Sequence, residues 1–437
     1  MLKQDTPSSN SLWLVTEKVV FLFVSFGVNL LLARHLQPEL YGSLSFLLAA
    51  VTILMPVMAL GLNSLVTREL MHRWDDTVSI LGSAIALRLL AGLLVAAVGV
   101  LAAHRLLPSS QWVLFSVLAV SSVSQCFVVI DFWLQAQSAN RYGAIARLSV
   151  LLLASVARLV AIYFDSGVDV FVYLLCAEWL VLALCYVQLY RRYGGWFTEL
   201  TLTKPEAANL FRQGMWLWFT AIGAILVLKV DQLMLAYLVN DQAVGIYAAA
   251  VRLSEVWYLL PVALMTGYFP HLIAAKEAGS GDYERSLQWL CDTLLCAAVV
   301  VAVFITLTAD FFVPLLFGNS YVESADVLVI HVWAGIFFFT AALVNRWLLI
   351  EGSLVATFCV QAVGTVTNIG FNFWLIPQYG VVGAAIATVL SALVGGYVIL
   401  LLHPRLYPMG KILSRSFCLP LRLGYRLYNV SKQSLRK

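Results

Sequence analysis

Charged side chains are scarce in this chain of 437 residues. Only 11% of the residues are Asp, Glu, Lys or Arg, whereas a typical soluble domain carries about 25%. Hydrophobic residues make up 62%, and the mean hydropathy is +0.89. This composition excludes an ordinary soluble globular protein and indicates that lipid is the main solvent of the chain.

The usual signatures of catalysis are absent as well. The sequence contains no GxxxxGK[ST] phosphate loop, no HExxH zinc motif and no GxSxG nucleophile elbow. The nearest two of its seven cysteines, Cys291 and Cys296, have neither CxxC nor metal-ligand spacing. We therefore expect no enzyme activity, no cofactor and no metal site. A membrane-embedded glycosyltransferase or polymerase is the less favoured enzyme alternative, because the longest predicted outer loop, 309–325, is short and lacks Lys, Arg and His.

Long apolar runs are what the sequence does contain. A spanning helix needs about 20 apolar residues to cross about 30 Å of hydrocarbon. The runs predict an all-α integral membrane protein with about 12 transmembrane helices, near 11–34, 42–64, 79–103, 112–135, 144–164, 168–190, 214–238, 244–268, 286–309, 326–349, 354–376 and 380–403. The first run carries Glu17 and Lys18 and is too long for a removable signal peptide.

The distribution of Lys and Arg predicts the orientation, because these residues accumulate in short cytoplasmic loops. With the N-terminus inside, the inner segments contain Lys3, Arg68, Arg73, Arg141, Arg191, Arg192, Lys204, Arg212, Lys276, Arg285 and Arg346. The outer loops 164–168, 239–243, 309–325 and 377–380 contain no Lys or Arg. Both termini are therefore predicted to be cytoplasmic, in a multi-pass membrane protein. The net charge of +4 then reflects topology, not nucleic-acid binding.

Two glycine turns, about two hundred residues apart, indicate an internal duplication. The segment Leu32–Gly42 resembles Leu235–Gly245, and each is followed by a proline, at Pro56 and Pro261. These matches predict two six-helix lobes, 1–200 and 201–403, in the same orientation. We interpret Gly42, Pro56, Gly245 and Pro261 as candidate gating or kink positions. Static kinks that neighbouring helices tolerate are the alternative.

The basic tail, 404–437, follows the second lobe and admits two interpretations. It is either an interfacial segment on the anionic leaflet or a partly disordered retention tail.

Several motifs resemble those of the polysaccharide transporter family, the Wzx-type flippases of the multidrug/oligosaccharidyl-lipid/polysaccharide exporter superfamily. They are Val230-Asp231-Gln232-Leu233-Met234-Leu235-Ala236-Tyr237-Leu238, Val244–Leu253, Leu260-Pro261, Ala33–Leu36 with Tyr41-Gly42, and Ile376–Thr388. The resemblance implies transfer of an undecaprenyl-pyrophosphate-linked oligosaccharide, an O-antigen, capsule or exopolysaccharide unit, from the cytoplasmic to the periplasmic leaflet by alternating access. It also implies contact with membrane lipids and makes a polysaccharide polymerase and chain-length machinery candidate partners.

Two transporter alternatives remain beside this resemblance. A multidrug and toxin extrusion exporter shares the twelve-helix plan, but cationic drugs favour an acidic interior, whereas this chain carries several Arg and Lys in its apolar runs. Lipid II flippases usually have two further helices, which the apolar runs do not supply.

Ionisable groups inside apolar runs are the default functional candidates, because they are costly in hydrocarbon. The cations predicted to line a lumen and contact the pyrophosphate are Arg88, Arg158, Lys229, Arg252 and Lys18. The anions predicted to serve ion coupling or salt bridges are Asp131, Glu178, Asp231 and Glu255. Structural pairing is the alternative for each: Arg88 or Arg158 with Asp131 or Glu178, Arg252 with Asp231, and Lys18 with Glu17.

Overall fold

The computed structural model describes residues 7–279, 282–419 and 422. The predicted inner cation Lys3 and tail residues 423–437 lie outside this part of the chain. Within it the secondary structure is helical, without strands. The chain divides into two compact units: Met1–Ala248 with Leu316–Ser320, called unit 1, and Ala249–Leu315 with Tyr321–Lys437, called unit 2.

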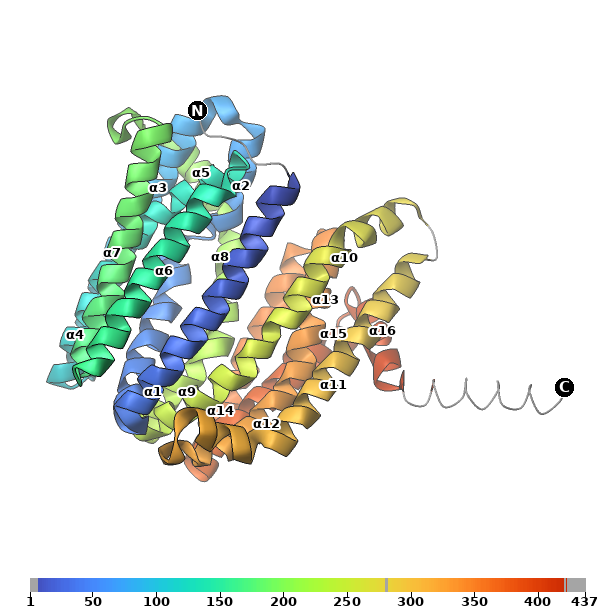
Figure 1. The fold of residues 1–437 in the computed structure, drawn as a ribbon. Coiled ribbons are helices and arrows are strands. Elements are labelled where there is room, and N and C mark those ends of the chain that lie inside the picture. The colour runs from blue at the N-terminus through green and yellow to red at the C-terminus, as the bar shows by residue number, and fades with distance from the viewer. Residues whose placement is uncertain (1–6, 280–281, 420–421, 423–437) are drawn as a thin grey trace. The chain divides into compact units, whose positions relative to one another are not determined.

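The helices of unit 1 pack side by side as a bundle (Figure 1). They are α1 (Pro7–Ala59), α2 (Leu62–His72), α3 (Thr77–Leu106), α4 (Ser109–Ser122), α5 (Val129–Ala136), α6 (Asn140–Tyr163), α7 (Val168–Tyr193) and α8 (Lys204–Leu238). Helix α9 (Asp241–Glu255) begins in unit 1 and ends in unit 2.

Unit 2 holds the helices of the second half of the chain. They are α10 (Leu259–Glu277), α11 (Asp282–Phe317), α12 (Glu323–His331), α13 (Gly335–Ile350), α14 (Leu354–Leu393), α15 (Ile399–Leu402) and α16 (Tyr407–Phe417). The last residues of α11 belong to unit 1.

Ten helical segments of the described chain are long and apolar enough to cross a membrane. Each predicted helix overlaps one of them and extends beyond it by a few residues at most. The two longest, Thr16–His72 and Val355–Leu402, each cover two predicted helices. The structure therefore confirms the all-α membrane class, and the number of crossings depends on whether these two segments turn back.

Both long segments are broken where the sequence predicts a turn. In α1, Gln37 leaves the helical region with φ 59° and ψ 168°, and the next residue is Pro38, whose ring disfavours helical geometry in the residue before it. In α14, Gly380 has φ 55° and ψ −130°, a conformation that side chains disfavour. Each break therefore separates two helices within one continuous segment.

The two repeat glycines meet inside unit 1. A Cβ atom added to Gly42 would collide with the backbone oxygen of Asp241, and one added to Gly245 would collide with that of Pro38. The contact is reciprocal, since each glycine faces the carbonyl that lies four residues before the other glycine. Only glycine allows backbones to approach so closely. The two glycine turns that match in the sequence thus meet in one reciprocal crossing between α1 and α9.

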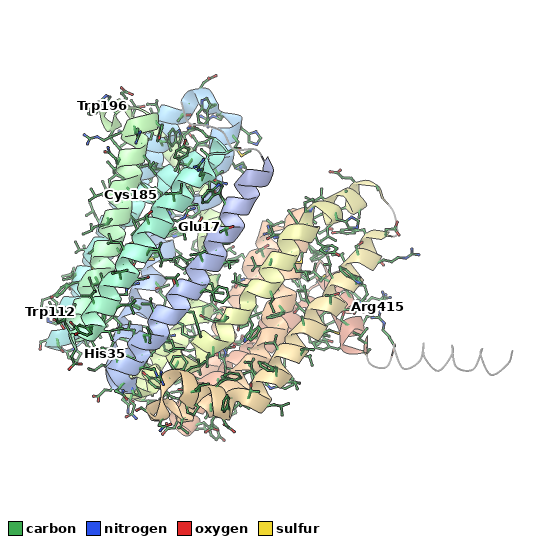
Figure 2. The ribbon with its side chains drawn as sticks, in the orientation of Figure 1. Glu17, His35, Trp112, Cys185, Trp196 and Arg415 are labelled. Atoms are coloured by element: carbon green, nitrogen blue, oxygen red, sulfur yellow. The ribbon has the colours of Figure 1, made fainter. Side chains whose placement is uncertain are left out.

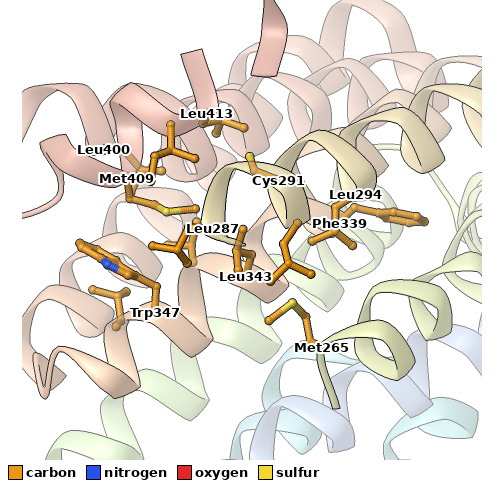
Figure 3. Packing of buried hydrophobic residues seen from close by; sticks show 14 of the residues in the cluster. Met265, Leu287, Cys291, Leu294, Phe339, Leu343, Trp347, Leu400, Met409 and Leu413 are labelled. Carbon is orange, nitrogen blue, oxygen red and sulfur yellow. The ribbon is translucent and has the colours of Figure 1, made fainter. Parts of the chain in front are cut away.

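Unit 2 has a well-defined apolar core, which includes the first part of the tail (Figure 3). Phe339 and Leu343 of α13 are buried there beside Leu294 of α11. Met409 and Leu413 of α16 are fully buried in the same cluster, while Lys411 and Arg415 are exposed. Residues Tyr407–Phe417 thus form an ordered helix packed on the protein, not a disordered segment.

We expect Gly42→Ala and Gly245→Ala to destabilise the protein by about 1–3 kcal/mol, because each new methyl group overpacks a backbone contact. Thermal unfolding in detergent measures the effect. Gly27→Ala and Gly267→Ala are matched controls, since nothing lies within 4 Å of a Cβ at either helical position. These controls should be neutral or slightly stabilising. Equal loss in both pairs would contradict the crossing.

Candidate functional site

Unit 1 contains a cavity of about 480 Å³ between α1, α2, α3, α4, α8 and the short 3₁₀ helix η2 (Val123–Val128). Most of its lining is apolar, and its polar side chains are Thr52, Asn63, Arg88, Ser122 and Gln125. Arg88 is the one charged residue among those that line it. The cavity is therefore an apolar chamber with a single cation in its wall.

Arg88 is held rigidly but keeps one donor group open. The side chain is buried, with the residue 7% exposed, and its guanidinium carbon lies 5.5 Å from the centre of the Phe132 ring. Its Nη2 donates to Oδ1 of Asn63 at 2.5 Å. Its Nη1 is buried without a hydrogen-bond partner among the described residues. A buried donor left unsatisfied is costly, so this geometry favours an acceptor, above all an anionic one.

A second cavity, of about 530 Å³, adjoins the first at Asn63. Its lining includes Arg68, His72 and Gln135, and also Phe132, which underlies the Arg88 guanidinium. Arg68 is half exposed and donates through Nη2 to Oε1 of Gln213 at 2.6 Å. We call this second cavity the vestibule. Asn63 and Phe132 thus connect a more exposed cation, Arg68, with the buried cation, Arg88.

A sharp bend positions Asn63 between the two cavities. Helix α1 ends at Ala59, and the following Leu60 and Gly61 have positive φ angles of 53° and 67°. A Cβ at Gly61 would collide with the backbone oxygen of Gly214 in α8. The turn therefore requires glycine, and it starts α2 so that its second residue, Asn63, reaches Arg88.

The membrane-boundary end of α2 is anchored to the start of α8 by Arg73. Its Nη2 donates to Oδ2 of Asp76 and to Oε2 of Glu206, both at 2.8 Å. These hydrogen bonds raise the pKa of Arg73 above its ordinary value, and the one to Glu206 has the larger effect. This clamp stays charged at every physiological pH and fixes the wall of the vestibule.

Arg147 is a central residue that the sequence did not single out. Through Nε and Nη2 it binds both carboxylate oxygens of Glu17, and through Nη1 it donates to Oδ1 of Asp131 and to the Tyr186 hydroxyl. Gln135 donates to the other oxygen of Asp131 at 2.9 Å. Figure 2 shows Glu17 on α1, on the side where α6 passes. The cluster ties α1 to α5, α6 and α7.

Two further predicted lumen cations, Arg158 and Lys18, do not line the unit 1 cavity. The sequence favoured a lumen position for Arg158, but the structure places it in an ion pair with Glu178, because α6 and α7 pack side by side and bring the two together. Lys18 is exposed, and its neighbour Glu17 pairs with Arg147 instead of with it. The interhelical alternative is therefore the observed arrangement for Arg158 and Glu178.

The remaining predicted residues are divided between the two units. Asp231 is buried and accepts a hydrogen bond from the Tyr247 hydroxyl at 2.6 Å within unit 1. Lys229 is half-buried in unit 1, whereas Arg252 and Glu255 belong to unit 2. The predicted Asp231–Arg252 pair would cross between the units and stays a prediction. Pro56 lines the cavity of unit 1. Pro261 is buried in α10.

Comparison with known proteins now decides the family. Residues 8–276 match the family model described as polysaccharide biosynthesis protein, which covers more than half of the chain. The chain belongs to this family. The resemblance seen in the sequence motifs is thereby confirmed.

Relatives of this polysaccharide biosynthesis protein include two from the archaeon Haloferax volcanii. The probable flippase AglR is 26% identical over 261 residues, 56% of this chain and 51% of that protein. The probable low-salt glycan biosynthesis flippase Agl15 is 26% identical over 197 residues, 44% of this chain and 41% of that protein. The matches thus span about half the length of these curated relatives or less.

Solved structures share the fold over nearly the whole chain. An inward-facing multidrug resistance MATE family transporter aligns with a TM-score of 0.70 and 13% identity, covering 89% of this chain and 94% of that one. The lipid II flippase MurJ in an inward closed conformation aligns with a TM-score of 0.67 and 13% identity, covering 95% of this chain and 92% of that one. At these identities the likeness establishes the fold.

We predict that Arg147→Met destabilises the polysaccharide biosynthesis protein by about 3–5 kcal/mol, because it strands two buried carboxylates. Adding Glu17→Gln and Asp131→Asn to that variant should restore most of the loss. Thermal unfolding in detergent measures both effects. Lys18→Gln is the control, since this exposed neighbour should change stability by less than about 0.5 kcal/mol. If Arg147→Met were as mild as Lys18→Gln, the cluster would not hold the helices together.

Proposed function

We propose that this protein is a flippase that moves a lipid-linked saccharide from one leaflet of the membrane to the other. Its family and the names of its two haloarchaeal relatives point to glycan assembly and to transport. The fold that it shares with MATE transporters and with MurJ is compatible with this role. Transport, not catalysis, is the activity that we assign to it.

The observation that carries the proposal is the open donor of Arg88. A lipid-linked saccharide presents phosphate oxygens at the junction of lipid and sugar, and guanidinium groups bind such oxygens strongly. Arg88 lines the unit 1 cavity; its buried Nη1 group has no partner among the described residues, while Nη2 is held by Asn63. A phosphate would satisfy Nη1 and could exchange with Asn63 at Nη2. Arg68 in the vestibule would meet the phosphate first.

The finer features of the mechanism belong to the same proposal. The breaks at Gln37 and Gly380 turn the ten apolar segments into twelve crossings, with both termini in the cytoplasm. Two lobes, 1–200 and 201–403, open alternately to either side. The cargo is an undecaprenyl-pyrophosphate-linked oligosaccharide, the membrane is a bacterial inner membrane, and a polysaccharide polymerase is a candidate partner.

An ion-coupled exporter of the MATE type is the second candidate, and one observation favours it. The Arg147 cluster contains two buried carboxylates, Glu17 and Asp131, against one guanidinium, so its formal charge is negative when both acids are ionised. A cluster with this balance of charges would attract a cation. The cavity itself, however, carries Arg88 as its only charge, which disfavours a cationic drug as cargo.

The direct test deletes the gene in a host without a redundant flippase and follows the leaflet location of the lipid-linked saccharide. We expect the saccharide to accumulate on the cytoplasmic leaflet and wild-type protein to restore delivery. Arg88→Gln should slow delivery at least about tenfold, because a charge-assisted hydrogen bond is worth about 1.5–3 kcal/mol.

Arg105→Gln is the matched control, because Arg105 lies on the same helix, α3, but is exposed near its end. It should deliver normally. Normal delivery in the deletion strain would refute the flippase proposal. Normal delivery by Arg88→Gln would refute the role of the cavity. If the deletion strain became sensitive to cationic drugs but delivered the saccharide normally, the exporter would be favoured.

A further inference from the structure

A groove between α6 and α7 forms a third hollow in unit 1, separate from the cavity and the vestibule. It has a volume of about 530 Å³ and shares no lining residue with either of them. Its lining is mainly apolar and includes Ile145, Val181 and Leu184. Ile145 and Leu184 are 41% and 66% exposed, on helices that are long and apolar enough to span a membrane. The groove therefore opens toward lipid.

The length of the groove matches one leaflet. Along α7 its lining runs from Val181 to Tyr193, which corresponds to about 18 Å at 1.5 Å per residue. Half of the hydrocarbon thickness is about 15 Å. On α6 the lining residues run from Tyr142 to Ser149 and lie at the same end of the helix pair. An extended acyl chain of a single leaflet fits this span.

The end of the groove at the membrane boundary is polar and basic. Arg192 lies in the lining with its guanidinium carbon 5.5 Å from the centre of the Tyr193 ring, and the Tyr193 and Tyr142 rings lie 5.2 Å apart. Arg192 is exposed and forms no ion pair in the described part of the chain. Tyrosines are typical of the headgroup level, where a cation attracts anionic lipids.

We propose that this groove is a binding site for one anionic phospholipid, with its phosphate at Arg192 and an acyl chain against Leu184 and Val181. The separation from the Arg88 cavity favours a resident membrane lipid over the transported lipid. Gln188, one helical turn before Arg192 in the lining, is positioned for the ester region. The proposal is independent of the transported cargo.

Native mass spectrometry of the full-length protein tests the site. The protein is mixed in detergent with phosphatidylglycerol or with phosphatidylcholine of the same acyl chains, and the retained lipid is counted. We expect selective retention of one phosphatidylglycerol. Arg192→Gln should lower that retention about fivefold, because a basic residue near the surface contributes about 1 kcal/mol to binding of an anionic lipid.

Arg191→Gln is the matched control, because the neighbouring Arg191 does not line the groove and stacks instead on Trp196. Figure 2 shows Trp196 beyond the end of α7 and Cys185, a groove residue, partway along the helix. Arg191→Gln should retain phosphatidylglycerol as the wild type does. Ser149→Phe, which fills the groove from α6, should reduce retention of either lipid.

Three outcomes would overturn the proposal. Equal retention of the two phospholipids by the wild type would show that the groove does not select an anion. Equal losses in Arg192→Gln and Arg191→Gln would show that general surface charge, not the groove, binds the lipid. Displacement of phosphatidylglycerol by added polyprenyl diphosphate would assign the groove to the transported lipid instead.

Discussion

Hydrocarbon offers no water to a charged side chain, so every charge inside unit 1 depends on a partner within the protein. Arg147 satisfies this constraint with Glu17 and Asp131, and Arg158 satisfies it with Glu178. These pairs join helices that are distant in sequence and stabilise the wall of the unit. Arg88 satisfies it only in part, since Asn63 occupies one of its terminal amino groups and leaves the other open. Arg88 lines a cavity. Under the proposed function, an anion that enters this cavity supplies the missing hydrogen-bond acceptor.

Other parts of unit 1 position Arg88 and the wall of its cavity. The bend at Leu60 and Gly61 directs Asn63 toward Arg88, and Phe132 supports the guanidinium from below. The second part of α1 begins after the break at Gln37. Near that beginning, the crossing of Gly42 and Gly245 fixes the register of α1 against α9. Small residues allow this backbone contact, and larger ones would force the helices apart. A shift at the crossing would therefore move the wall that holds Pro56 and Thr52, both of which line the cavity.

Local features of the sequence predicted much of this arrangement. Pro38 and Gly380 mark the helix breaks because proline and glycine act on the backbone at their own positions. The match between the two turns was visible because a close backbone contact requires glycine at both Gly42 and Gly245. Arg88 stood out as a cation within an apolar run, and the structure places it at a cavity. Its role in substrate binding stays a prediction.

Pairings over long sequence distances were beyond the reach of the sequence. Arg147 and Glu17 lie 130 residues apart, and no local pattern links them. Arg158 and Arg88 look alike in sequence, yet one is paired across helices and the other faces a cavity, because helix rotation and neighbours decide the outcome. Asn63 was missed because a lone amide in an apolar run carries little signal. Asn63, Arg88 and Phe132 come together only once α2, α3 and α5 are packed.

The proposed function requires the Arg88 cavity to receive the phosphate of a lipid-linked saccharide. Photo-crosslinking tests it most directly, with a lipid-linked disaccharide diphosphate that carries a photoreactive group next to the phosphates, followed by mapping of the labelled peptides. We predict labelling in the peptides that hold Asn63, Arg88 and Gln125, competed by unlabelled lipid and lost in Arg88→Gln. Two results would contradict this role of the Arg88 cavity. One is labelling that unlabelled lipid removes but that falls only in other segments, and the other is undiminished labelling of these peptides in Arg88→Gln.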